Sequence, residues 1–500
     1  EEEVSSTAGD VPLLTHLLNE SKDSKQDEQT GDAFDVGAHI DLDQRPQGDN
    51  NTDHEPPTNW RQACVCHMKA LLHGKGAVLI PPGVFYFVLW AGFACTFPFL
   101  AVFLSGLGLN NTQVGLLTAL LPLVSLLGSP LWGLAADRSG RHRLIVALCA
   151  IVGAACLNLL PYTSGFWHVA TVMILQSSFL SATVPLTDNM VLHHLAANRG
   201  EYGKHRLWGA VSWGLFSLLF GFVITFSSWR WGLYGTLALE VVLAFCLLLT
   251  SMSTQITASL PKWREVWLIL SNLRVLAFLL IVMVMGAGTQ MIFTFLFLFL
   301  EELGADERLV GLSLLFTVST EIPFFFFSNR LLATFGVQTL ILASMVAYVV
   351  RVFCYSLLVN PWTVLPLELL HGLSFGAMWA AGIHHTRELA PPALQATAQG
   401  VFTGMYSGLG SSIGCLLGGW TYETFGPRIL FRSAGVIVSV CIVLYIALER
   451  RALVDTLRKA CRPESATEEL SSTSSGQPSL QVVEIELDEL EEAGVVQEEY

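Results

Sequence analysis

The sequence has few charged residues. Asp, Glu, Lys and Arg make up 14% of its 500 residues, whereas 52% are hydrophobic. Soluble domains carry about 25% charged residues, so this composition excludes an ordinary soluble globular protein. The formal net charge of −14 comes mostly from the two ends of the chain and provides no basic face. Since nucleic acid is recognised through such a face, it is excluded as a partner.

Cysteine pairs that could form a disulfide framework are also missing. Most of the ten cysteines fall inside apolar segments, where they act as small hydrophobic residues. The sequence has no spaced set of metal ligands, no nucleophile elbow and no phosphate-binding loop. His193-His194 and His384-His385 are adjacent pairs, which point to different helix faces and make poor metal clamps. We therefore expect no enzyme, no metal site and no cofactor.

Long hydrophobic stretches fill the middle of the chain. A spanning helix needs about 20 mostly apolar residues, and the sequence predicts twelve such spans, six on each side of a polar connection. They cover residues 83–106, 112–136, 143–162, 168–192, 206–226, 231–251, 274–299, 308–331, 337–358, 363–386, 396–420 and 428–449. The predicted fold is an all-α membrane protein of twelve transmembrane helices in two pseudo-symmetric six-helix halves.

The domain boundaries follow from this pattern. We expect one six-helix half over 81–251, a central cytosolic loop over 252–273 and a second half over 274–450. The flanking segments 1–80 and 451–500 are acidic and polar. Such segments cannot bury enough apolar surface to fold alone, so we expect two disordered tails, which are candidates to bind cytosolic trafficking proteins.

Basic residues gather in alternate loops. One set of loops is rich in them, with Arg138, Arg141, Arg143, Arg199, Lys204, Arg206, Lys262, Arg264, Arg274, Arg330 and Arg387, and the other holds only Arg230, Arg308 and Arg428. The excess of Lys and Arg marks the cytosolic side. We therefore expect both termini in the cytosol, with the plasma membrane as the default location and an endolysosomal membrane as the alternative.

Charged residues inside a span are candidates for function, because burying them in lipid is unfavourable. In the first half, Asp188 and Asn189 lie in the fourth span, and Arg206 and Trp213 share a face of the fifth, seven residues apart. An acid and a guanidinium can bond hydroxyl groups while an indole stacks on a sugar face. This set predicts a binding site for a polyhydroxylated solute. The alternative is a structural Asp188–Arg206 pair, with Trp213 as packing.

The second half carries a different set, Glu321, Arg351, Glu368 and His371, of which the last two lie one helical turn apart. A carboxylate in an apolar setting and a histidine can both exchange protons near neutral pH, and a nearby arginine can change that exchange. These residues predict proton coupling. The alternative is a buried ion-pair network that fixes helix packing.

The loop after the second span reads GLAADRSGRHR and resembles the signature loop of the major facilitator superfamily. The resemblance implies a gate, in which ion pairs break and reform as the two halves rock. The residues concerned are Gly133, Asp137, Arg138, Gly140, Arg141 and Arg143. The alternative is a passive turn with basic anchors.

The segments PLWGLAADRSGRHR and YGKHRLWGAVSWGL also resemble the lactose permease branch of oligosaccharide–proton symporters. In that family the arginine of the second segment and the tryptophan seven residues later bind sugar, which implies this role for Arg206 and Trp213. The family's helix-four acid precedes that arginine by 18 residues, and 206 − 188 = 18 selects Asp188. The segment HGLSFGAMWAAGIHH looks closer to the eukaryotic group that contains the major facilitator superfamily associated domain.

The second half matches the permease family in part. The family's helix-nine arginine precedes its helix-ten histidine by 20 residues, and 371 − 351 = 20 assigns these roles to Arg351 and His371. The family's proton-carrying glutamate is replaced by Ser374, with Glu368 as a candidate substitute. Glu321 lies in the helix that carries a glutamate in the family, helix eight, but it does not align cleanly with that glutamate. The family's helix-seven aspartates are absent from this sequence.

The combined expectation is a secondary active transporter that works by alternating access in the lipid bilayer. Proton-coupled symport of a small polar solute, such as a sugar, is the leading hypothesis. Transport of a nucleoside, amine or organic anion without proton coupling is one alternative. A receptor or scaffold that transports nothing is the other.

Overall fold

The computed structural model describes residues 80–195, 202–250 and 263–460, and within these ranges all regular structure is helical. Ten helices are long and apolar enough to cross a membrane, and a bent pair adds an eleventh span. The remaining predicted span, 396–420, coincides with three consecutive helical segments, α18 (Gln395–Thr403), η8 (Gly404–Gly410) and α19 (Ser411–Phe425). The predicted all-α membrane fold is confirmed.

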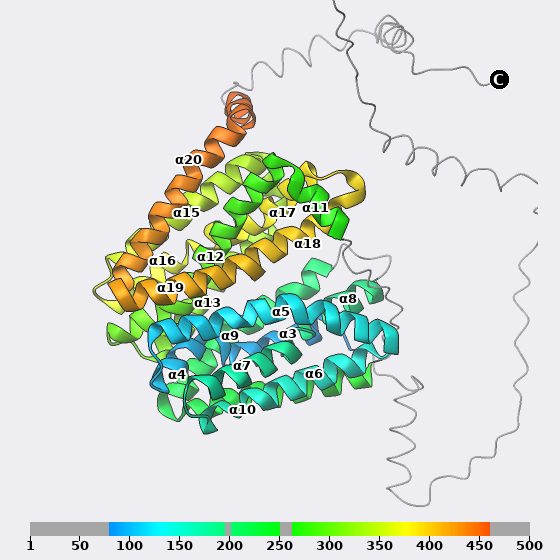
Figure 1. The fold of residues 1–500 in the computed structure, drawn as a ribbon, viewed down its shortest axis with the longest axis vertical. Coiled ribbons are helices and arrows are strands. Elements are labelled where there is room, and N and C mark those ends of the chain that lie inside the picture. The colour runs from blue at the N-terminus through cyan, green and yellow to red at the C-terminus, as the bar shows by residue number, and fades with distance from the viewer. Residues whose placement is uncertain (1–79, 196–201, 251–262, 461–500) are drawn as a thin grey trace, which may run out of the picture. The chain divides into compact units, whose positions relative to one another are not determined.

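The first half begins with a broken helix. Its first span joins α3 (Pro82–Ala94), the short η2 (Phe97–Phe99) and α4 (Leu100–Gly106). The other helices of this half are α5 (Asn111–Ser139), α6 (His142–Leu157), α7 (Phe166–Leu180), α8 (Thr183–Leu195), α9 (Tyr202–Phe226) and α10 (Trp229–Leu249). Figure 1 shows these helices packed together as one group, in blue to green.

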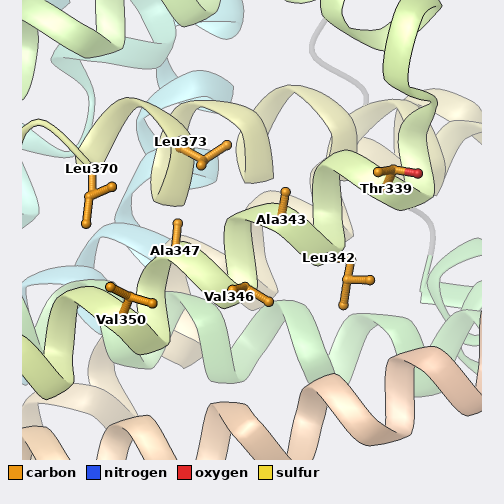
Figure 2. A pocket seen from close by; sticks show the side chains of 8 residues that line it. All are labelled: Thr339, Leu342, Ala343, Val346, Ala347, Val350, Leu370 and Leu373. Atoms are coloured by element: carbon orange, nitrogen blue, oxygen red, sulfur yellow. The ribbon is translucent and has the colours of Figure 1, made fainter.

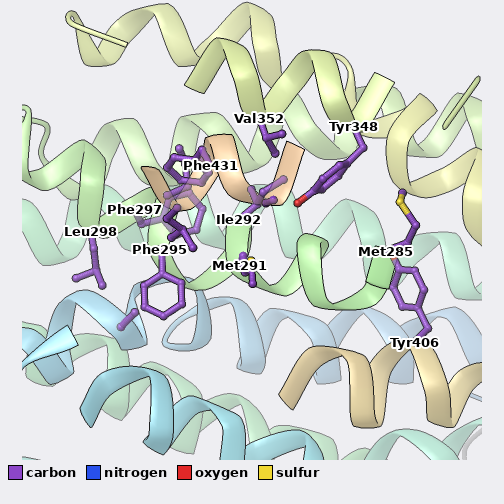
Figure 3. Packing of buried hydrophobic residues seen from close by; sticks show 14 of the residues in the cluster. Met285, Met291, Ile292, Phe295, Phe297, Leu298, Tyr348, Val352, Tyr406 and Phe431 are labelled. Carbon is purple, nitrogen blue, oxygen red and sulfur yellow. The ribbon is translucent and has the colours of Figure 1, made fainter. Parts of the chain in front are cut away.

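The second half repeats this helical pattern. Its first helices are α12 (Leu273–Glu302), α13 (Glu307–Phe326), α14 (Ser328–Phe335) and α15 (Val337–Ser356). They are followed by α16 (Val364–Glu368), η6 (Gly372–Ala377), α17 (Met378–Leu389), the α18–η8–α19 span and α20 (Pro427–Ala460). The most buried of these is α12, where Ile292 and Phe295 pack in a cluster with Tyr348, Tyr406 and Phe431 (Figure 3). These five residues come from α12, α15, η8 and α20, so the cluster joins segments that are far apart in the sequence.

Two details differ from the expected domain pattern. The segment expected as a central loop contains α11 (Trp263–Ser271), a short helix with Trp263 and Trp267 exposed. The element α20 extends to Ala460, past the expected start of the second tail, but it is kinked at Glu449, whose φ and ψ angles of −105° and 16° are not helical. The expected first tail up to residue 79, the loop residues 251–262 and the tail beyond residue 460 lie outside the described residues.

Glycines allow the two halves to approach closely at two helix pairs. A Cβ atom on Gly115 of α5 would lie 2.8 Å from the Cα atom of Gly419 of α19, and the two helices run side by side in Figure 1. In the same way, a Cβ atom on Gly311 of α13 would lie 2.4 Å from the Ser217 carbonyl oxygen of α9. Both contacts exclude any larger residue, and both lie on the side that we expect to be external.

The tenth span is broken where its candidate residues lie. The helices Pro361–Glu368 and Gly372–Leu389 meet at an angle of 42°, and the second begins with the π-helical turn η6. π-helical turns occur frequently at functional sites. Gly372 lies against α13, where a Cβ atom would be 2.6 Å from the Thr320 carbonyl oxygen. This close approach brings the broken helix against α13 and positions His371.

Candidate functional site

The predicted solute residues of the first half form an ion pair. The Arg206 guanidinium on α9 donates to both carboxylate oxygens of Asp188 on α8, at 2.9 and 3.1 Å. The Tyr86 hydroxyl on α3 donates to the same carboxylate at 2.7 Å. The side chains of Arg206 and Asp188 are 40% and 23% exposed, so a solute could reach them. The cluster therefore presents a cation and an anion side by side, both partly exposed.

The other two predicted solute residues are placed differently. Trp213 is half-buried two turns along α9 from Arg206, and its ring meets the edge of Trp90 with centroids 5.8 Å apart. This contact places the Trp213 indole beside α3, the helix that carries both Trp90 and Tyr86. Asn189 is exposed and, as the next residue along α8, points about 100° away from Asp188. The structure thus brings Asp188 and Arg206 together, and it does not bring Asn189 into the cluster.

The second half contains a buried ion pair between α15 and α16. The Arg351 guanidinium donates to Glu368 at 2.5 Å, and the side chains are 3% and 4% exposed. The hydroxyl groups of Tyr355 and Thr317 also donate to the Glu368 carboxylate, at 2.5 and 2.8 Å. The Arg351 Nε group donates to the Tyr355 hydroxyl. Buried charges persist when they are paired and hydrogen-bonded in this way.

His371 connects this ion pair to Glu321. Its Nδ1 atom lies 2.8 Å from a guanidinium nitrogen of Arg351, and its Nε2 atom lies 3.8 Å from a carboxylate oxygen of Glu321 on α13. The residue that replaces the family's glutamate, Ser374, lies 3.4 Å from Arg351. All four predicted proton-coupling residues therefore belong to one connected group.

The two clusters lie on neighbouring helices of the two halves. Arg206 on α9 pairs with Asp188 in the first half, and Glu321 on α13 lies near His371 in the second. Helices α9 and α13, which carry these residues, pack against each other. We refer to the two clusters together, Asp188 and Arg206 with Glu321, His371, Arg351 and Glu368, as the polar path.

The predicted gating loop forms a compact turn. Gly140 ends α5 with a φ angle of 63°, a conformation that favours glycine. Asp137 lies 2.8 Å from the Nε2 atom of His142 in the first turn of α6, and Arg143 donates to the Thr250 carbonyl oxygen after α10. The other residues predicted for the gating loop are Gly133, Arg138 and Arg141. The two arginines are exposed, and no other atom lies within 4 Å of a Cβ atom built on Gly133. The loop thus links α5, α6 and α10 within the first half.

Several contributors were not foreseen from the sequence. Tyr86, Tyr355 and Thr317 hold the two carboxylates, yet none is ionised and none was singled out. Tyr355 follows Arg351 by four residues, so helical spacing was an available signal for it. Glu240 on α10 was also missed, although an acid inside a span is a candidate by the same reasoning that selected Glu321.

In the second half, the seventh predicted span has neutral polar groups where the permease family has aspartates. The Thr289 hydroxyl lies 2.8 Å from the Tyr406 hydroxyl, and the Gln290 amide donates to Thr294 at 3.3 Å. At these positions α12 therefore offers neutral hydrogen-bonding groups and no carboxylate.

A separate cavity of about 440 Å³ lies away from the polar path, between α15 and the broken tenth span (Figure 2). Its lining is apolar except for one hydroxyl group and comprises Thr339, Leu342, Ala343, Val346, Ala347, Val350, Leu370 and Leu373. A groove of this kind suits lipid chains and not a polar solute.

Comparison with known proteins supports these assignments at the level of family and fold. The model of the MFS_1 like family matches residues 82–433. The maltose permease of Geobacillus stearothermophilus is 29% identical over 377 residues, which cover 74% of this chain and 94% of the permease. The probable 3-phenylpropionic acid transporter of Escherichia coli is 27% identical over 362 residues, 70% of this chain and 92% of that protein.

A third relative and the solved structures extend the comparison. The major facilitator superfamily domain-containing protein 6-like protein B of Xenopus laevis is 26% identical over 179 residues, 36% of this chain and 29% of that protein. The crystal structure of the nucleoside transporter NupG superposes with a TM-score of 0.66 at 19% identity and covers 73% of this chain and 98% of NupG, a likeness of fold alone. The chain is a multi-pass membrane protein that belongs to the MFS_1 like family of major facilitator transporters.

Proposed function

We propose that this protein is a proton-coupled symporter of a small polar solute, with sugars as the first class to test, and that it works by alternating access. The observation that carries the proposal is the position of Arg206. It pairs with Asp188 in its own half, and it lies on α9, which packs against α13, the helix of the other half that carries Glu321. An event at one carboxylate therefore changes the attraction of the guanidinium to the other.

The exposure of the two clusters supports a division of roles. Arg206 and Asp188 are partly exposed, which suits the binding of hydroxyl groups, and Trp213 lies on the same helix as a platform for a sugar ring. Arg351 and Glu368 are almost fully buried, which suits proton chemistry shielded from water. We therefore assign solute binding to the first half and proton handling to the second.

The coupling follows from charge. An ionised Glu321 attracts Arg206 across the boundary and holds the halves together at that point. A protonated Glu321 loses this attraction, and Arg206 is then left to Asp188 and to a bound solute. His371 lies beside Glu321, and 3.8 Å is slightly longer than a hydrogen bond. When Arg351 withdraws from Nδ1, a proton can enter the ring there while the Nε2 proton passes to Glu321. Proton uptake and solute binding would thus favour the same rearrangement of the halves.

The names of the relatives support transport and leave the solute class to experiment. The maltose permease favours a sugar, the 3-phenylpropionic acid transporter favours an organic anion, and the NupG fold is that of a nucleoside transporter. The last two correspond to the alternative of a solute other than a sugar. The receptor or scaffold alternative predicts no saturable uptake at all.

The test is proton flux in proteoliposomes that contain a pH-sensitive dye. Pooled sugars, nucleosides, amines and organic anions are added in turn, and the proposal expects one pool to move protons in the wild type. Arg206→Ala should abolish this movement, whereas Arg230→Ala, at an exposed arginine beyond the polar path, should preserve it. Solute uptake without proton movement would refute coupling, and no uptake from any pool in folded protein would favour a receptor.

We also propose that both termini face the cytosol, because the loops rich in arginine lie on that side under the positive-inside rule. Epitope tags at the two ends should bind antibody only after cells are permeabilised. The same tagged protein would report the membrane in which it resides. Staining at the surface of intact cells would overturn the proposed orientation.

A further inference from the structure

An acid that the polar path does not use is buried between α3 and α10. Glu240 on α10 is 0% exposed, and neither of its carboxylate oxygens has a hydrogen-bond partner in the described part of the chain. Within the described part of the chain it forms no ion pair. An ionised carboxylate is strongly unfavourable in such a place unless a positive charge accompanies it. The described side chains do not supply that charge.

The opposite helix approaches this carboxylate closely. Gly92 of α3 faces Glu240, and a Cβ atom at this glycine would lie 2.9 Å from the Oε1 atom of Glu240. Any residue larger than glycine would therefore press on the carboxylate. The absence of a side chain at Gly92 lets the acid lie directly against the backbone of α3.

Further oxygen atoms lie one helical turn away. Thr236 precedes Glu240 by four residues on α10, and Thr96 follows Gly92 by four residues, so both share the faces that meet at this crossing. Their hydroxyl oxygens are 2.7 Å apart, and both side chains are buried. The Thr236 hydroxyl also donates to the Gly92 carbonyl oxygen at 2.9 Å. Four oxygen-bearing groups thus lie where α3 crosses α10: the Glu240 carboxylate, the Thr96 and Thr236 hydroxyls and the Gly92 carbonyl.

The break in the first span contributes to this arrangement. Helix α3 ends at Ala94, and Thr96 has φ and ψ angles of −130° and −45°, outside the helical range. The Thr96 N–H donates to the Phe93 carbonyl oxygen at 3.2 Å, while the Gly92 carbonyl oxygen accepts from Thr236. In membrane transporters, backbone carbonyls at unwound points of a helix coordinate small cations.

We propose that Glu240, the hydroxyl groups of Thr96 and Thr236, and the Gly92 carbonyl form a binding site for Na⁺. All the donors are oxygen atoms, which hard cations prefer. One carboxylate balances one monovalent charge, whereas a divalent ion would leave excess positive charge in an apolar interior. The sequence-based expectation of no metal site rested on histidines and cysteines, and it did not consider a carboxylate flanked by threonines.

The site is independent of the proposed proton path. Both α3 and α10 belong to the first half, so the crossing need not open when the halves move. A bound ion stabilises the folded state because the unfolded chain does not bind it. The direct readout is therefore thermal stability, which does not require knowledge of the solute.

The experiment measures the unfolding temperature of the full-length protein, purified in detergent, at constant pH and ionic strength. Choline chloride is replaced stepwise by NaCl or, in parallel, by KCl. We expect NaCl to raise the unfolding temperature of the wild type by several degrees, and KCl to do less. Glu240→Gln and Thr236→Val should remove the response to Na⁺. The control Glu388→Gln, at an acid whose side chain is 49% exposed, should retain it.

Two results would overturn the proposal. The first is an unfolding temperature that is the same in all three salts, or a response to Na⁺ that survives in Glu240→Gln. The second is stability that depends on pH and not on Na⁺, which would make Glu240 a buried neutral acid. If Glu240→Gln does not fold, Thr236→Val decides the question, because it keeps the carboxylate and removes one ligand.

Discussion

His371 lies with its Nε2 atom 3.8 Å from the Glu321 carboxylate, and its other ring nitrogen faces Arg351 at 2.8 Å. A guanidinium can only donate hydrogen bonds, so the Nδ1 atom of His371 must accept this one. The imidazole is therefore neutral, with its proton on the Nε2 atom that faces Glu321. Arg351 thus selects the tautomer whose Nε2–H faces the acid of the neighbouring helix. This proton can pass to Glu321 only if another proton enters at Nδ1, which requires Arg351 to withdraw from the ring.

The first prediction concerns this proton. In His371→Gln, the amide can still accept from Arg351 but cannot transfer a proton to Glu321. We expect solute-driven proton movement to fall by about a hundredfold or more, within the range that a single proton-transfer group contributes. Exchange of labelled solute across the membrane, which needs no net proton transfer, should persist.

His384→Gln is the matched control, because His384 lies on α17 and its side chain is 50% exposed. It should leave both proton movement and solute exchange near the wild-type values. Equal loss of both activities in His371→Gln would argue instead that His371 holds the structure of the broken helix.

The second prediction separates proton handling from simple packing at Arg351 and Glu368. Glu368→Gln leaves the buried Arg351 charge uncompensated, which should destabilise the protein by about 3–5 kcal/mol. The double variant Arg351→Met, Glu368→Met removes both charges, and it should recover much of that stability. Thermal unfolding of the purified variants measures both changes.

The activity of the double variant then decides between the two interpretations. If the ion pair takes part in proton coupling, the stabilised double variant should bind solute and fail to move protons. If the pair serves packing alone, the double variant should transport as well as the wild type. The second outcome would remove Arg351 and Glu368 from the proposed proton path.

The fold was more predictable from the sequence than the site was. Apolar runs of spanning length are visible residue by residue, so the helices and the two halves could be predicted. The pairing of Asp188 with Arg206 could also be anticipated, because both are charged residues of neighbouring spans and the resemblance to the permease family places an acid 18 residues before the arginine. The Tyr86 contact with Asp188 spans 102 positions and depends on how the helices pack, which no local pattern encodes.

The break in the tenth span shows the same limit. One-turn spacing predicted that Glu368 and His371 share a face, but the bend between them arises from contacts with α13. Gly372 meets the Thr320 carbonyl oxygen of that helix, and the Thr320 hydroxyl accepts from the Gly372 N–H at 3.2 Å. Such a contact between helices is set by tertiary packing and leaves no periodic signal in the sequence.

The third prediction concerns the solute class and rests on Trp213. If the solute is a sugar, Trp213→Ala removes a stacking platform and should weaken apparent affinity by about tenfold, on the order of 1–2 kcal/mol. Trp213→Phe should recover part of this loss because an aromatic face remains. Uptake measured over a range of solute concentrations separates affinity from maximal rate.

Trp231→Ala serves as the control, since Trp231 on α10 is 55% exposed and lies outside the polar path. It should leave the apparent affinity unchanged. Undiminished sugar affinity in Trp213→Ala would restrict this residue to packing on Trp90, and would favour a solute other than a sugar.

The fourth prediction concerns the close contact between α5 and α19. In Gly115→Ala, the added Cβ atom would lie 2.5 Å from the Cys415 carbonyl oxygen, so the halves could no longer meet on the expected external side. We expect uptake to fall by more than tenfold, because alternating access requires this closure. We also expect a cysteine introduced at Leu120 to react faster with an external thiol reagent. Gly106→Ala is the control, since no atom lies within 4 Å of the added Cβ. Normal uptake in Gly115→Ala would mean that the transport cycle does not depend on this contact.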